Sequence, residues 1–111
     1  MATKTYKRLG ATTVTADTNT SLYTVPSSTE TIVSSLVVCN IGTSVRTFRI
    51  AIVDGAIANV ANEDYLYYDI TIPANDTFVV TGGFTLSAAY SILVRASHAD
   101  IVFSAWGTEI S

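Results

Sequence analysis

Hydrophobic and polar residues alternate with a period of two through much of this chain, which is the pattern of a β-strand with one face against a core. The clearest example is residues 47–53. There Phe48, Ile50 and Ile52 fall on one face, and Thr, Arg and Ala fall on the other. This segment is therefore predicted to be a strand that buries one side.

Residues 31–41 are apolar on both faces. In this interpretation Ile32, Leu36 and Val38 share one face. The opposite face carries Val33, Val37, Cys39 and Ile41. Such a strand lies either deep between two layers or with its second face against another chain. With the turn signals that follow it, it is predicted to form a central β-hairpin over residues 31–53.

The rest of the chain predicts more short strands and no segment with a sustained helical period, although residues 54–64 have room for one helical turn. They are expected at residues 5–9, 22–25, 65–72, 77–81 continued by 84–86, 90–97 and 101–107, with the last two forming a terminal hairpin and Gly82-Gly83 a bulge. Residues 54–64 lack a strand pattern and are predicted to be a mobile or partner-contacting loop. About eight short strands indicate an all-β fold, a two-layer antiparallel β-sandwich. It is jelly-roll-like rather than immunoglobulin-like, because the Cys…Trp…Cys signature is missing.

The chain has the length of a single domain, expected over residues 1–111, with residues 1–10 as an extended N-terminal arm. Its core is predicted from the inward positions of the alternating segments. The predicted core residues are Leu36, Val38, Phe48, Ile50, Ile52, Leu66, Ile70, Ile72, Ile92, Val94 and Phe103.

Composition adds an expectation of assembly. Hydrophobic residues make up 49% of the chain and charged residues 14%, with a mean hydropathy of +0.40, which is apolar for a monomer. We therefore expect a homo-oligomer. The net charge of −3 argues against nucleic acid as a partner. Because neither a long apolar run nor a signal peptide is found, we expect no membrane partner and a protein that stays in the cytoplasm where it is made.

Catalytic and metal-binding patterns are not found in the sequence. A Cys–His pair would have to combine Cys39, in an apolar strand, with His98, in a turn. Residues 62–64 cluster acidic groups but lack the spaced ligands of a calcium loop. We therefore expect no catalytic, cofactor or metal site, and no enzymatic activity.

Outward-facing aromatic and aliphatic residues are the remaining candidates for a site. They suit a protein interface better than a carbohydrate platform, because aliphatic neighbours favour a dry contact. A basic N-terminal cluster could contact an acidic partner. The candidate interface residues are Lys4, Lys7, Arg8, Val37, Tyr65, Tyr67, Leu93 and Trp106.

Several segments carry a resemblance. SLYTVP at residues 21–26, TIVSSLVVCN at 31–40 and TFRIA at 47–51, with YLYYD, IPANDT and the ending FSAWGTEI, resemble small β-rich structural proteins of tailed-bacteriophage virions. This resemblance implies a non-enzymatic virion component, most plainly a capsid decoration or cement protein, with a neck or tail accessory role as the alternative. It also implies the major capsid protein or neck and tail proteins as partners, location in the virion and a trimer. A carbohydrate-binding receptor-recognition module is the competing hypothesis.

Overall fold

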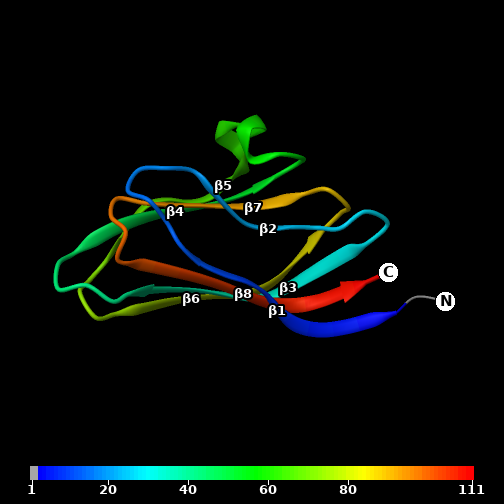
Figure 1. The fold of residues 1–111 in the computed structure, drawn as a ribbon, viewed down its shortest axis with the longest axis horizontal. Helices are drawn as coiled ribbons and strands as arrows, with labels where there is room; N and C mark the ends of the chain where they lie inside the picture. Colours follow the sequence, from blue (N-terminus) through cyan, green and yellow to red (C-terminus); the bar gives the residue numbers. More distant parts are fainter. Residues whose placement is uncertain (1–2) are drawn as a thin grey trace.

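The computed structural model describes residues 3–111, which form eight strands in two layers (Figure 1). The strands are β1 (Lys4–Thr13), β2 (Thr20–Thr24), β3 (Glu30–Asn40), β4 (Arg46–Val53), β5 (Tyr65–Ile72), β6 (Thr77–Leu86), β7 (Ser91–Ala96) and β8 (Ile101–Ile110). Two short 3₁₀ helices, η1 (Ile57–Asn59) and η2 (Asn62–Asp64), lie between β4 and β5. Within these residues no helix is long and apolar enough to cross a membrane.

Each layer is a four-stranded antiparallel sheet. Sheet A has the order β1-β8-β3-β6, and sheet B has the order β2-β7-β4-β5. The chain passes from one sheet to the other at every connection except the one between β4 and β5. First and last strands therefore pair, as do second and seventh, third and sixth, and fourth and fifth. This nested pairing is a jelly roll, so the predicted fold is confirmed.

The two predicted hairpins are wrong, because their strands belong to different sheets. β3 pairs with β6 and β8, whereas β4 pairs with β5 and β7. Between them the buried Asn40 side chain donates to the carbonyls of Ser44 (2.9 Å) and Ile72 (3.2 Å) and accepts from the amide of Gly42 (2.9 Å). These bonds hold a turn that carries the chain across the sandwich. β7 and β8 are separated in the same way.

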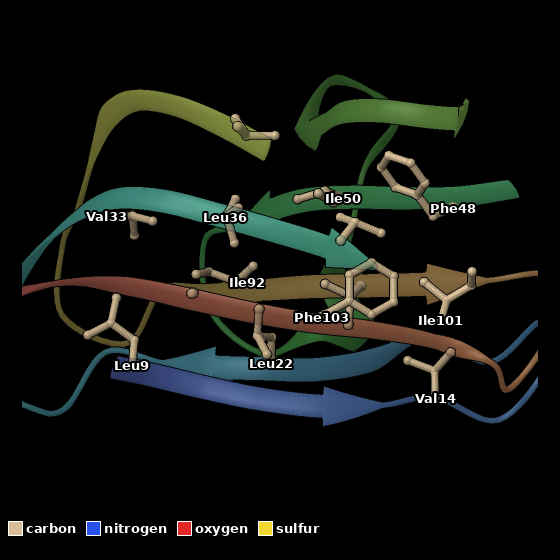
Figure 2. Packing of buried hydrophobic residues seen from close by; sticks show 14 of the residues in the cluster. Leu9, Val14, Leu22, Val33, Leu36, Phe48, Ile50, Ile92, Ile101 and Phe103 are labelled. Atoms are coloured by element: carbon tan, nitrogen blue, oxygen red, sulfur yellow. The ribbon is translucent and has the colours of Figure 1, made fainter. Parts of the chain in front are cut away.

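The core lies between the sheets and contains most of the predicted residues (Figure 2). Eight of them are buried: Leu36, Val38, Phe48, Ile50, Ile72, Ile92, Val94 and Phe103. Ile52 and Ile70 are partly buried against the same cluster. The prediction that Leu66 lies in the core is wrong, because 41% of its surface is exposed.

Two bulges in β5 explain why Leu66 is exposed. Ala51 and Ile50 of β4 lie opposite Tyr65 and Tyr67, which leaves Leu66 as an extra residue. A second register shift follows before Ile70. The alternation therefore changes phase, and Tyr67 points inward and packs against the core while Leu66 does not.

The prediction of an extended N-terminal arm is also wrong from Lys4 onward, because Lys4–Thr13 form strand β1. β1 pairs with β8 from Lys4 opposite Ile110 to Thr13 opposite Val102. Leu9 lies in the core, so this strand is fixed by hydrogen bonds and by packing. Residues 1 and 2 of the expected arm lie outside the described residues.

Candidate interaction surface

The outward-facing side chains of sheet A form one surface, which we call the outer face of sheet A. Residues directly opposite each other in a sheet point to the same side, so the strand register gives the rows that cross it. From one end to the other the rows are Lys4, Ile110 and Glu30; Tyr6, Thr108, Ile32 and Thr85; Arg8, Trp106, Ser35 and Thr81; Ala11, Ser104, Val37 and Val79; and Thr13, Val102, Cys39 and Thr77.

This face carries apolar and hydroxyl side chains with little charge. In the four rows from Tyr6 to Thr13 the only charged residue is Arg8. Half of the large exposed hydrophobic residues found in the described chain lie here: Tyr6, Ile32, Val79 and Trp106. A sheet surface of this composition suits contact with another protein.

Trp106 lies in the middle of the outer face of sheet A, on β8, with 44% of its surface exposed. The Arg8 guanidinium stands 5.9 Å from the centre of its ring, a cation–π contact from the neighbouring strand. The Ser34 hydroxyl donates to the Trp106 carbonyl (3.0 Å). Strand β8 is paired on both sides, so the indole is presented on a rigid support.

A bulge in β3 decides which residues reach this face. Val33 lies opposite Phe84, and Ser35 lies opposite Thr81, so Ser34 is extra on β3 while Gly82 and Gly83 are extra on β6. Both glycines have positive φ, as the predicted bulge there requires. Because the bulge changes the phase, Ile32 faces outward and Val33 is buried, the reverse of the sequence interpretation.

The outer face of sheet B is different, because the chain covers part of it. Ile57 and Val60 from the β4–β5 connection, with Tyr65, pack against the buried Ala51, Val53 and Leu93. Figure 1 shows this connection on the outer side of the sheet. Leu93 is fully buried. Its assignment to an intermolecular interface is therefore wrong, and the predicted partner-contacting loop is the segment that covers it.

Beside this cover, sheet B carries a polar cluster. Arg49 donates to both carboxylate oxygens of Asp69 (2.7 and 3.2 Å), and its guanidinium lies 3.9 Å from the centre of the Tyr68 ring. The hydrogen bond from Arg49 lowers the pKa of Asp69. Arg95 lies directly opposite Arg49 and donates to Asn19 (3.4 Å). An adjacent hollow of about 10 Å³ has room for a single water molecule.

The predicted interface residues are thus divided among several places. Lys4, Arg8, Val37 and Trp106 lie together on the outer face of sheet A. Tyr67 points into the core, Tyr65 belongs to the cover of sheet B, and Lys7 forms an ion pair with Glu109 (3.4 Å). Sequence reasoning missed Tyr6 and Ile32. Tyr6 shares its phase with Lys4 and Arg8, so the period of two could have found it.

Cys39 and His98, the two residues that a Cys–His pair would need, have different hydrogen-bond partners. The Thr77 hydroxyl donates to the Cys39 thiol (3.6 Å), and His98 Nδ1 lies 3.0 Å from the Ser97 hydroxyl. Among residues 3–111, no three His, Cys, Asp or Glu side chains gather in a way that could hold a metal ion.

Comparison with known proteins gives a likeness of fold. No family model and no curated protein matches the sequence. A chain in the crystal structure of the T13 IBDV viral particle aligns with a TM-score of 0.59 and 6% sequence identity. The alignment covers 98% of this chain and 30% of that chain. At this identity the likeness concerns the jelly-roll fold alone.

Proposed function

We propose that this protein is a non-enzymatic structural component of a tailed-phage virion, most specifically a decoration or cement protein on the head. The observation that carries the proposal is the outer face of sheet A, a partly apolar sheet surface with few charges, on a jelly roll whose other sheet is partly covered by its own chain. A jelly roll also occurs in a chain of a viral particle, which supports the same role. The resemblance of the sequence to small virion proteins supplies the phage context.

In this role the domain is part of the particle's shell, and a neighbouring chain covers the outer face of sheet A. Trp106 and Val79 are exposed on strands that are already paired within the sheet, so little backbone freedom is lost when a partner covers them. Arg8 and Lys4 lie at the rim of the same face and suit an acidic neighbour. Because the shell holds many copies of the protein, individually weak contacts add up to strong attachment through multivalency.

The carbohydrate-binding hypothesis needs at least two of the outward aromatic residues in one groove with polar groups beside them. Trp106 lies on the outer face of sheet A, Tyr65 lies in the cover of sheet B, and Tyr67 points into the core. These three residues therefore form no shared groove. A neck or tail accessory role remains the alternative within the virion, because it requires the same kind of contact surface.

Mass spectrometry of purified particles tests the proposal. A head decoration protein should be present in tens to hundreds of copies, normalised to the major capsid protein of the same particles. A copy number of about a dozen would instead support the neck or tail role, through the symmetry of those structures. Particles without the protein, from a culture in which the lysate contains it, would overturn the structural role.

A further inference from the structure

We propose that the outer face of sheet A binds the same face of a second copy of this chain, about a two-fold axis that runs along β8. The inference rests on the proposed structural role, since it names the partner of the surface on which that role depends. It is tested on the isolated protein, so that the two proposals can fail separately.

The strand order defines what such an axis would bring together. Strand β8 lies between β1 and β3, so a rotation about β8 places β1 of one copy over β3 of the other. Each row of the outer face of sheet A then lies on the same row of the second copy. Two stacked sheets with nearly aligned strands pack about 10 Å apart, which is the spacing of an ordinary β-sandwich core.

The charges at the end of the face fit this arrangement. Lys4 on β1 and Glu30 on β3 occupy the two ends of one row, with Ile110 between them. Neither takes part in the ion pairs of the described residues, which join Lys7 to Glu109, Arg46 to Asp100 and Arg49 to Asp69. The two-fold axis brings Lys4 of each copy over Glu30 of the other, so two opposite-charge contacts form at once.

The other rows also bring complementary side chains together. Tyr6, 79% exposed, meets Ile32 of the second copy, which is an aromatic–aliphatic contact. Ala11 meets Val37, so a small residue faces a larger one. Trp106 lies at the axis and meets its own counterpart, in the central position where interface hot spots concentrate.

The β1 edge of sheet A argues for a face-to-face contact on this side of the sheet. β1 is an edge strand with Lys4, Lys7 and Arg8 along it, and charged side chains at an edge oppose the addition of another strand. The acid that pairs with Lys7 is Glu109 of the same chain. Lys4 and Arg8 point to the outer face. The charges of Lys4 and Arg8 therefore lie on the outer face of sheet A. They also oppose the pairing of another strand with the β1 edge.

Sedimentation and Trp106 emission across a dilution series test the proposal. The wild-type protein should form a dimer at micromolar concentration, and the emission of its single tryptophan should shift to longer wavelength as the dimer dissociates. Trp106→Ser should weaken dimerisation roughly thirtyfold or more. Trp106→Phe, which keeps an aromatic ring, should weaken it less. Thermal unfolding checks that both variants fold.

Charge exchange tests the predicted geometry. Lys4→Glu and Glu30→Lys should each weaken dimerisation roughly fivefold or more, and the double variant should recover most of the loss. Glu63→Lys is the matched control, because it makes the same charge change as Glu30→Lys on an exposed residue of η2. Within one chain Lys4 and Glu30 are two strands apart, about 10 Å, so recovery in the association constant reports contact between copies.

A monomer at these concentrations, a trimer, or single variants that behave like the Glu63→Lys control would each overturn the two-fold contact. So would a double variant without recovery. A monomer that is nevertheless abundant in particles would overturn this inference and leave the virion role standing. A protein that dimerises in solution but is absent from particles would overturn the virion role and leave this inference standing.

Discussion

Tyr23 of β2 and Glu109 of β8 join the two sheets through a hydrogen bond of 2.5 Å from the phenol to the carboxylate. The same phenol lies 2.9 Å from the Thr31 hydroxyl of β3. The other carboxylate oxygen of Glu109 accepts from Lys7 of β1 (3.4 Å). Burial, and then the hydrogen bond to Glu109, raises the pKa of Tyr23 to about 12. Four strands are thus connected by one polar cluster.

The first prediction is that Tyr23→Phe destabilises the protein by about 1–2 kcal/mol near neutral pH, because Glu109 and Thr31 lose a partner. In the folded state the tyrosine keeps its proton up to about pH 12, whereas in the unfolded state it loses it near its ordinary pKa of 10.0. Its stabilising effect is therefore full below about pH 10 and is lost as the pH rises through about 12.

Urea unfolding of both proteins at several pH values measures this effect. The difference in unfolding free energy between wild type and Tyr23→Phe should shrink as the pH rises above about 10. A difference that stays constant across the alkaline range would contradict the assigned role of the cluster.

The second prediction concerns the covered part of sheet B. Leu93→Ala should cost about 2–4 kcal/mol and should increase hydrogen exchange in residues 57–64, because Leu93 is the buried platform for that segment. Val79→Ala, at an exposed position of sheet A, is the control and should change stability by less than about 0.5 kcal/mol. Equal losses in the two variants would show that the outer faces do not differ as described.

The third prediction concerns Gly107. A Cβ at this position would collide with the carbonyl oxygen of Ile32 on the neighbouring strand, which is backbone and cannot move aside cheaply. Gly107→Ala should therefore cost about 3 kcal/mol or more. Ser104→Ala, on the same strand but on the outer face, should stay within about 0.5 kcal/mol of wild type. A Gly107→Ala variant as stable as this control would mean that β3 and β8 approach less closely.

The fourth prediction concerns the crossing between the sheets. Asn40→Ala removes donors from two backbone carbonyls and an acceptor from the Gly42 amide, and should cost about 2–4 kcal/mol. Thermal unfolding measures it beside Asn59→Ala, an exposed asparagine expected to be nearly neutral. If both variants unfold alike, the turn does not depend on the Asn40 side chain.

The period of two located nearly every strand, because alternation depends on local burial. It could not identify which strands pair, since a strand that crosses to the opposite sheet has the same alternation as one that turns back. The predicted hairpin of residues 31–53 failed for this reason. Its turn residues, Asn40 and Gly42, are used as expected, but they direct the chain across the sandwich.

Bulges and chain-internal cover account for the errors at the candidate site. One extra residue at Ser34 exchanges the sides of Ile32 and Val33, and the extra residues in β5 bring Tyr67 inward. Leu93 was predicted to need a partner because it faces away from the core. Its cover is the connection between β4 and β5, and sequence alone does not tell where such a connection folds back.

A three-dimensional reconstruction of the purified phage particle tests whether this protein is a structural component of the virion. The reconstruction should show many copies of an eight-stranded jelly roll bound to the shell, with the outer face of sheet A, including Trp106, covered by a neighbouring chain. Particles that contain no such domain, or that carry it with this face open to solvent, would rule out the proposed role of this face.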